Sequence, residues 1–425
     1  MAVFASWAPG APPSAATRLS TSQATPWGRL ADHPFRVMRA RRRGRTMTVG
    51  AAAAAAVVAE GAVVALPWRV RILGAAIDRA VGPYARMSDA KLRMLRAHPG
   101  PRWVGELLNG RPAPTVSIAE LAVPGPAGQV PALWYRPHGW RTTDRRPVVV
   151  DLPGGGFVFG DRTMTTWLGS RLAARLGAVV VAPSYRQAPE HPVPAAGEDC
   201  YAVTAWAAEH AADLGADAGR LAVVGESAGA TLAAVVTLMA RARGAPRIRA
   251  QALLQGAFDL RPDAPAMTAR QGWPFGRSAD VPDQVAAYLG GHGHPEDPLV
   301  SPLLAPDHAG LPPAFVLTAD HDYVQEDGRR YARALHAAGV PVEHAHYADS
   351  PHGIFSFPGW CAASGPALDR PTAFLERALA PRPAPPDRPR ATAQGRGSRR
   401  DQGFSSRRAP RPAAHRRQTP VTRSA

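Results

Sequence analysis

The chain of 425 residues has little cysteine and almost no lysine: two cysteines, and one lysine against 49 arginines. Two cysteines cannot build a disulfide framework, so nothing in the sequence calls for an oxidising compartment. Neither C-x-x-C nor H-E-x-x-H occurs, so the sequence gives no support for a metal site. The preference for arginine over lysine, with abundant alanine and proline, indicates a GC-rich coding sequence. It weakens any functional interpretation of arginine-rich stretches.

The positive charge lies at the two ends of the chain. The first 46 residues carry eight arginines and one aspartate, and residues 381–425 carry twelve arginines and two aspartates. These ends account for the whole net charge of +17, so residues 47–380 are electrically neutral. A nucleic-acid-binding domain would carry its basic surface on the folded part. We therefore predict no nucleic-acid partner, with binding through the arginine-rich ends as the alternative.

Composition divides the chain into segments. Both ends lack the periodic apolar residues that a core needs, so we expect disorder there, or an over-long start assignment at the N-terminus. Helical spacing of apolar residues comes next, and then strands and helices alternate. The predicted division is an N-terminal extension (1–46), a helical cap region (47–110), a catalytic domain (111–380) with a cap insertion (261–311), and a Pro/Arg-rich tail (381–425).

Residues 47–68 form an apolar run directly after a basic stretch, as a signal peptide or membrane anchor does. Most of the run is alanine, which inserts poorly, and Glu60 would cost about 2.5–3.5 kcal/mol on insertion scales. We therefore predict a cytoplasmic protein in which this run packs over the catalytic domain as a helix. Membrane anchoring or export through it is the alternative. The sequence leaves membrane association and a homodimer open.

Short apolar runs alternate with helical spacing after residue 147. A nearly unbroken apolar run, typical of a strand buried on both faces, occurs at 147–152, and further strands are predicted at 178–183, 221–224, 250–255, 314–319 and 342–347. Helices are predicted between and after them, at 165–176, 195–214, 228–243, 326–338 and 368–379. This alternation predicts an α/β fold with a mostly parallel central sheet and helices on both of its faces.

The segment L-A-V-V-G-E-S-A-G-A-T (221–231) joins a predicted strand to a predicted helix through a tight turn centred on Ser227. It has the pattern G-x-S-x-G of a nucleophile elbow, in which the serine is strained and its hydroxyl projects above the sheet. Gly225 and Gly229 avoid the collisions that side chains would cause there. We therefore predict that Ser227 is a nucleophile.

A nucleophilic serine needs a base, usually histidine, and the histidine needs an acid that fixes its tautomer. With this elbow the chain order is serine, acid, histidine, each at the carboxyl end of a strand. Asp322 and His352 each lie just past a predicted strand, so we predict them as acid and base. Asp320 is the alternative acid because it lies nearer the strand end. His344 and His346 lie within a predicted strand, where structural roles are more common.

Three glycines, Gly154 to Gly156, directly follow the predicted strand at 147–152. Glycines let the backbone approach a substrate closely, so that its N–H groups can bind an oxyanion. Taken alone, such a run is more typical of a flexible turn. Combined with the elbow, the acid and the histidine, all in the required order, it predicts an oxyanion-binding loop.

Five stretches resemble the hormone-sensitive-lipase-like (bacterial family IV) esterases of the α/β-hydrolase fold, over about residues 65–380. They are D-L-P-G-G-G-F-V-F-G-D (151–161), Y-R-Q-A-P-E-H-P-V-P-A-A-G-E-D (185–199), G-E-S-A-G (225–229), P-P-A-F-V-L-T-A-D-H-D-Y-V (312–324) and H-G-I-F (352–355). The resemblance implies an α/β-hydrolase fold with a helical cap. The site residues that it implies are Ser227 as nucleophile, Asp322 as acid, His352 as base, and the N–H groups of Gly155, Gly156 and Ala228 as oxyanion donors. It also implies that Arg186, Glu190 and Asp199 support the site from below.

The chain departs from the family pattern at two positions. The glycine loop of the family normally opens with histidine, and this chain has Pro153 there. That histidine shapes the loop and is not an oxyanion donor, so we expect catalysis to survive with an altered loop geometry. Glu226 stands where aspartate is commoner, which keeps a carboxylate one methylene further out. Neither change removes a group that transfers a proton.

The resemblance implies a serine carboxylic-ester hydrolase that acts on short-chain esters or lactones and needs no metal or organic cofactor. Candidates to line an apolar acyl pocket are Trp68, Trp103, Met267, Trp273 and Phe275. One alternative is a hydrolase of another acyl substrate, such as an acetylated natural product, an amide or a carbamate. A second is a non-catalytic small-molecule receptor on the same fold, which would typically lack a histidine at the position of His352.

Overall fold

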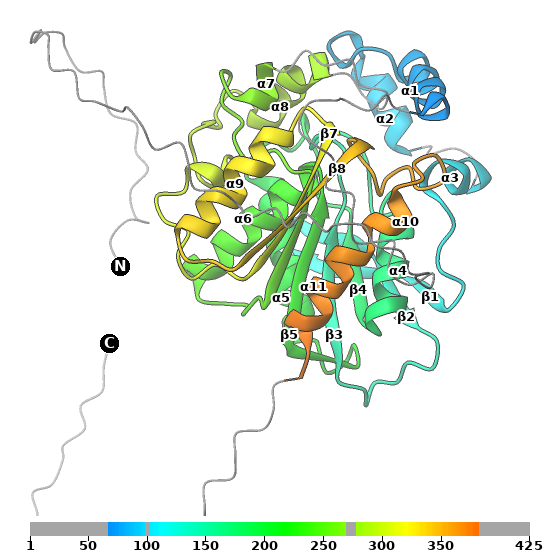
Figure 1. The fold of residues 1–425 in the computed structure, drawn as a ribbon, viewed down its shortest axis with the longest axis vertical. Coiled ribbons are helices and arrows are strands. Elements are labelled where there is room, and N and C mark those ends of the chain that lie inside the picture. Colours follow the sequence, from blue (N-terminus) through cyan, green and yellow to red (C-terminus); the bar gives the residue numbers. More distant parts are fainter. Residues whose placement is uncertain (1–66, 98–101, 269–277, 382–425) are drawn as a thin grey trace, which may run out of the picture. The chain divides into compact units, whose positions relative to one another are not determined.

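A computed structural model describes part of the chain, namely residues 67–97, 102–268 and 278–381 (Figure 1). Some of the predictions concern residues outside these ranges: the extension at 1–46, most of the apolar run at 47–68, almost all of the tail at 381–425, and both Trp273 and Phe275. Among the helices that are described, none combines the length and apolar character needed to cross a bilayer.

An eight-stranded sheet forms the centre of the fold, with its strands in the order β1-β2-β4-β3-β5-β6-β7-β8. The strands are β1 (Val116–Gly125), β2 (Gly128–Pro137), β3 (Arg146–Leu152), β4 (Val179–Pro183), β5 (Ala216–Glu226), β6 (Ala250–Leu254), β7 (Ala314–His321) and β8 (Val342–Pro351). Strands β3 to β8 are parallel to one another, and β2 is antiparallel to its neighbours β1 and β4. The sheet is therefore mostly parallel, as predicted.

Helices cover both faces of this sheet (Figure 1). One face carries α4 (Thr166–Leu176) and α11 (Asp369–Leu379), with the short α10 (Ser364–Ala367) before α11; the other carries α5 (Ala195–Glu209), α6 (Ala228–Arg243) and α9 (Gln325–Ala337). Val148 and Val150 of β3 join the apolar cluster of one face, and Val149 joins that of the other. All three are fully buried, which explains why this strand is an unbroken apolar run.

Two further groups of helices lie near the end of the sheet where the parallel strands finish (Figure 1). The first group is α1 (Trp68–Val81), η1 (Tyr84–Arg86), α2 (Asp89–Ala97) and α3 (Arg102–Asn109). The second is α7 (Pro265–Thr268), η2 (Ser278–Asp280), α8 (Val281–Leu289) and η3 (Pro302–Leu304). The groups meet where η1 contacts α8. They occupy the segments in which the sequence predicts a cap.

One helix is shorter than predicted, and the strand after it is longer than predicted. The helix predicted to reach residue 214 ends at Glu209, and the strand predicted from 221 begins at Ala216. Gly215 between them has a φ of 62°, and a Cβ there would collide with the carbonyl oxygen of Arg141. This close approach comes from a distant loop, so the local apolar pattern could not predict where the chain turns.

Candidate active site

Ser227 lies on a sharp turn between β5 and α6. Its φ of 58° and ψ of −124° are strained for a residue with a side chain. The turn is so tight that a Cβ on Gly225 would collide with the carbonyl of Gly229. The N–H of Ser227 donates to the carbonyl of Leu254 at 2.8 Å, which holds the turn against β6. The pattern G-x-S-x-G therefore forms the predicted strand, turn and helix.

A continuous chain of hydrogen bonds connects the side chains of Ser227, His352 and Asp322. Ser227 Oγ lies 2.7 Å from His352 Nε2, and His352 Nδ1 lies 2.8 Å from Asp322 Oδ1. Asp322 directly follows β7, and His352 directly follows β8. The carboxyl ends of parallel strands meet at one edge of a sheet, so residues that are distant in sequence come together there.

The environment of His352 favours its charged form. Burial alone would lower the pKa of this imidazole, but the charge and hydrogen bond of Asp322, together with the charge of Glu226, outweigh burial. The pKa of His352 is therefore raised above its ordinary value of 6.5. An imidazole with a raised pKa is a stronger base toward the Ser227 hydroxyl.

Gln255 orients both Asp322 and the loop that carries His352. Its Nε2 donates to Asp322 Oδ2 at 2.9 Å and to the carbonyl of Pro351 at 2.7 Å, and its Oε1 accepts the N–H of Ile354 at 3.1 Å. Gln255 has a φ of 55°, an unusual conformation for a residue other than glycine. The sequence offered one weak signal for it, a polar residue at the end of an apolar strand.

The alternative acid and the other two histidines lie in a separate cluster. Asp320 Oδ1 accepts from Gln325 Nε2 at 2.9 Å and lies 2.8 Å from His346 Nε2. His344 and His346 both contact the hydroxyl of Thr318. Burial, reinforced by the neighbouring His346, lowers the pKa of His344 to about 4. The structure thus brings Asp322, and not Asp320, to His352.

The glycine loop packs directly against the elbow. A Cβ on Gly154 would lie 2.9 Å from the carbonyl oxygen of Glu226 and 3.3 Å from Ser227 Cβ, so only glycine fits there. Gly155 and Gly156 have φ of 121° and 60°. Within the described part of the chain, the N–H groups of Gly155, Gly156 and Ala228 donate to no backbone carbonyl. They are therefore available to an acceptor beside Ser227.

Comparison with known proteins agrees with this geometry. A family described as alpha/beta hydrolase fold matches residues 149–356. The carboxylesterase NlhH of Mycobacterium tuberculosis is 37% identical over 299 residues, which cover 69% of this chain and 89% of the relative. The ethyl acetate hydrolase of Pseudomonas putida is 31% identical over 253 residues, 56% of this chain and 75% of the relative. The solved esterase of Pyrobaculum calidifontis has a TM-score of 0.63 at 31% identity, covering 74% of this chain and 100% of that one.

The chain belongs to the hormone-sensitive-lipase-like esterases of the α/β-hydrolase fold. It is a hydrolase of carboxylic esters. The predicted fold class and enzyme class are thereby confirmed.

Glu226 of this esterase connects the elbow to the loop after His352. Its Oε1 accepts the N–H of Phe355 at 2.8 Å, and its Oε2 accepts the hydroxyl of Ser356. The side chain is buried, and burial raises the pKa of this carboxyl despite both hydrogen bonds. The carboxylate that the sequence retains at this position therefore fixes the backbone that follows the histidine.

The cap insertion of the esterase reaches the glycine loop through α8. The side-chain amide of Gln284 occupies the space that a Cβ on Gly156 would take. The ring of Tyr288 stacks on that of Phe157 with centroids 3.9 Å apart. These two residues are contacts that the sequence did not predict, because they depend on how the insertion folds back.

Two of the predicted acyl-pocket residues lie elsewhere. Trp68 and Trp103 are each 66% exposed and line an outer groove of about 820 Å³ between α1, α3 and the segment around Trp360. Neither Ser227 nor His352 lines this groove. These two tryptophans therefore line an outer groove, and this groove does not include the nucleophile or the catalytic histidine. Met267, on α7 of the cap insertion, is buried in the core cluster.

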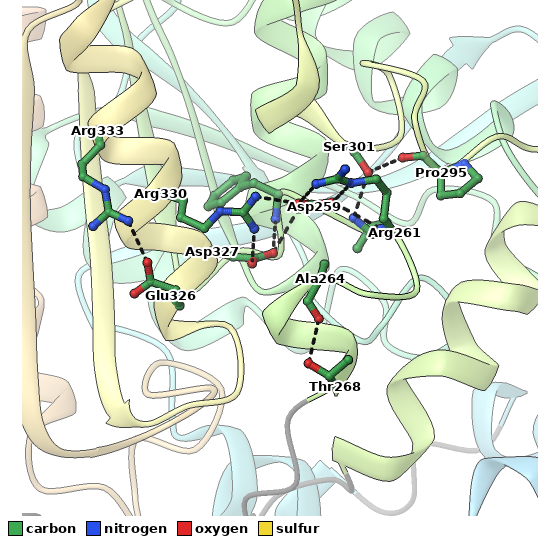
Figure 2. A network of polar contacts seen from close by, with 12 residues as sticks. Asp259, Arg261, Ala264, Thr268, Pro295, Ser301, Glu326, Asp327, Arg330 and Arg333 are labelled. Carbon is green, nitrogen blue, oxygen red and sulfur yellow. Dashed lines mark hydrogen bonds and ion pairs between the residues drawn. The ribbon is translucent and has the colours of Figure 1, made fainter. Parts of the chain in front are cut away.

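A buried ionic cluster joins the start of the cap insertion to α9, the helix that follows Asp322 (Figure 2). Asp259 is fully buried and accepts from Arg261 and Arg330 at 2.8 Å each. Asp327 Oδ2 accepts the N–H of Asp259 at 3.1 Å. Burial would raise the pKa of Asp259, but the two guanidinium groups outweigh it and hold this pKa below its ordinary value. The cluster fixes the insertion to the helix beside the acid.

Proposed function

We propose that this esterase works by a two-step acyl transfer on Ser227. Ser227 Oγ attacks the ester carbonyl while His352 Nε2 takes its proton, and Asp322 stabilises the imidazolium. His352 then protonates the leaving alcohol, and water repeats the cycle on the acyl-enzyme. The observation that carries the proposal is the unbroken chain from Ser227 through His352 to Asp322, with distances of 2.7 and 2.8 Å.

The proposed donors to the tetrahedral oxyanion are the N–H groups of Gly155, Gly156 and Ala228. Ala228 is the first residue of α6, so its N–H is one of those that a helix leaves unbonded, and the helix dipole favours negative charge there. The packing of Gly154 against Ser227 supports the proposal, since it places the loop beside the nucleophile. Pro153 precedes these donors and is not one of them.

We propose short-chain esters or lactones as substrates. Gln284 and Tyr288 of α8 pack from the cap against Gly156 and Phe157 of the loop, and a cap held this close to the loop supports small acyl groups. A relative named ethyl acetate hydrolase, 31% identical, supports the same class. Hydrolysis of an acetylated natural product, an amide or a carbamate is the alternative within the same mechanism. A panel of p-nitrophenyl esters of increasing chain length, assayed beside lactones and arylamides, distinguishes these substrates.

The variant S227A tests the mechanism. We expect kcat on p-nitrophenyl acetate to fall at least about 10⁴-fold, because the nucleophile is lost. A matched control is S117A, which removes an exposed hydroxyl on β1 and should leave kcat unchanged. A fluorophosphonate probe should label the wild-type chain at Ser227 and leave S227A unlabelled. Near-normal activity of S227A would refute the mechanism, and a wild-type chain that is never labelled would favour a non-catalytic receptor.

A further inference from the structure

Donors from outside hold the carbonyl groups of the oxyanion loop, residues 153–160. Several come from the segment 185–188: Tyr185 Oη donates to Pro153 at 2.9 Å, the N–H of Ala188 to Phe157 at 3.1 Å, and Gln187 Nε2 to Phe159 at 2.8 Å. A peptide unit is planar, so fixing a carbonyl also fixes the direction of the N–H that follows it. The direction of the loop's N–H groups therefore depends on these donors.

The carbonyl of Val158 has a donor of different origin. Arg96, near the end of α2 in the N-terminal group of helices, donates to it from Nε at 2.9 Å. The same guanidinium donates from Nη2 to the carbonyl of Ala188 and from Nη1 to Glu190 at 2.7 Å. The Arg96 side chain is only 18% exposed. All three nitrogens of its guanidinium donate hydrogen bonds, one to the oxyanion loop and two to Ala188 and Glu190.

Arg96 is connected to a proposed oxyanion donor through two peptide units. The carbonyl of Val158 and the N–H of Phe159 belong to one unit, and that N–H donates to the carbonyl of Gly155 at 2.8 Å. The carbonyl of Gly155 and the N–H of Gly156 belong to the next unit in the series. Because both units are rigid planes, a guanidinium that fixes the first also fixes the direction of the Gly156 N–H.

This part of the loop needs external support. Gly155, Gly156 and Phe157 have successive positive φ values of 121°, 60° and 65°. For Phe157, which has a side chain, such a conformation is strained and persists only where the surroundings impose it. On the side of the N-terminal helices, Arg96 and the edge contact of Tyr84 with Phe159, with centroids 5.9 Å apart, supply that support.

We propose that Arg96 is a positioning residue for the oxyanion hole, so that the hole is complete only when α2 is docked on the loop. The inference rests on the function proposed above, in which the N–H of Gly156 binds the oxyanion. It also makes the N-terminal helices part of the catalytic apparatus. Lys91 Nζ donates to the carbonyl of Val81 at 2.6 Å, which connects α2 to the end of α1.

The variants R96M and R96K test the proposal. R96M keeps the aliphatic stem and removes every donor, whereas R96K keeps the charge near Glu190 and lacks the fork that spans two carbonyls. The matched control is R93M, an exposed arginine on the same helix. E190Q serves as a comparison, because it removes the charge that pairs with Arg96 and leaves both carbonyl acceptors of Arg96 in place. Circular dichroism and thermal unfolding confirm that each variant is folded at the assay temperature.

The measurements are kcat, KM and the affinity for a trifluoromethyl ketone matched in length to the ester substrate. The ketone forms an oxyanion on the nucleophilic serine, so its affinity reports on the hole. For R96M and R96K we expect kcat to fall about 10- to 100-fold with little change in KM, since misplacing a catalytic group by 1 Å costs about 10²-fold. Affinity for the ketone should fall by the same factor. R93M should remain close to wild type, and E190Q should lose less kcat and less ketone affinity than R96M.

The outcomes separate this proposal from the one on which it rests. If R96M and R96K are folded and keep the kcat and ketone affinity of R93M, Arg96 has no positioning role. A variant that loses thermal stability alone, with wild-type kcat below its unfolding temperature, also refutes that role. If R96M does not fold, R96K decides. A wild-type chain that neither hydrolyses esters nor binds the ketone refutes the proposed function itself, and this inference falls with it.

Discussion

His352 is the residue whose charge state is expected to set the activity of this esterase. It can accept the Ser227 proton only when its imidazole is neutral, and its pKa is raised above 6.5 because Asp322 and Glu226 outweigh the effect of burial. We therefore expect kcat/KM to rise with pH and to level off, with the midpoint above 6.5. A pH profile with an ester that does not ionise measures this midpoint. A midpoint below 6.5 would contradict the electrostatic description.

Glu226 should shift that midpoint when its charge is removed. E226Q can still accept the N–H of Phe355 and donate to Ser356, so the loop after His352 should keep its shape. Without the negative charge, the pKa of His352 should fall, and the midpoint of the pH profile should move to lower pH. E226A serves as comparison: it also loses the two hydrogen bonds, so its kcat at the plateau should fall further. An unchanged midpoint in E226Q would show that Glu226 acts through geometry alone.

At the scale of elements, α9 allows a comparison of two ion pairs on one helix. Arg330 pairs with the fully buried Asp259, whereas Arg333 pairs with Glu326 at the surface (Figure 2). Removing one partner of a buried charge is costly, although Arg261 still compensates Asp259, so R330M should lose about 2 kcal/mol of unfolding free energy. R333M should lose less than about 1 kcal/mol. Denaturant titration of both variants measures the difference, and equal losses would refute a special role for the buried cluster.

Most strands and helices of this fold could be predicted from the sequence, because strands buried on both faces are continuous apolar runs. The positions of Asp322 and His352 followed from the predicted strands, since each comes just after one of them. The contacts that orient them could not be predicted in this way. Gln255 and Arg96 act on backbone groups far along the chain, and no local pattern records a hydrogen bond of that kind. Tertiary packing determines these contacts.

At the scale of the whole molecule, the net positive charge lies at the two ends of the chain, and the candidate catalytic residues lie between them. Every contact described for Ser227, His352 and Asp322 comes from residues 67–381, within the segment that is nearly neutral overall. We therefore expect a chain without residues 1–46 and 382–425 to keep the kcat/KM of the full chain. Assay of both chains on the same short ester measures this. A large loss would show that an end contributes to the site.

The hydrogen bond from Arg96 to Val158 has a consequence for modularity. A cap can be exchanged as a unit only if it makes no contact on which the catalytic loops depend. Here α2 of the N-terminal helices contacts the loop beside the nucleophile through Arg96. The N-terminal helices therefore cannot be treated as a part separate from the catalytic domain. A chimera that receives the N-terminal helices of a relative would need a donor for the Val158 carbonyl. Exchange of the insertion around α8 would leave that donor in place.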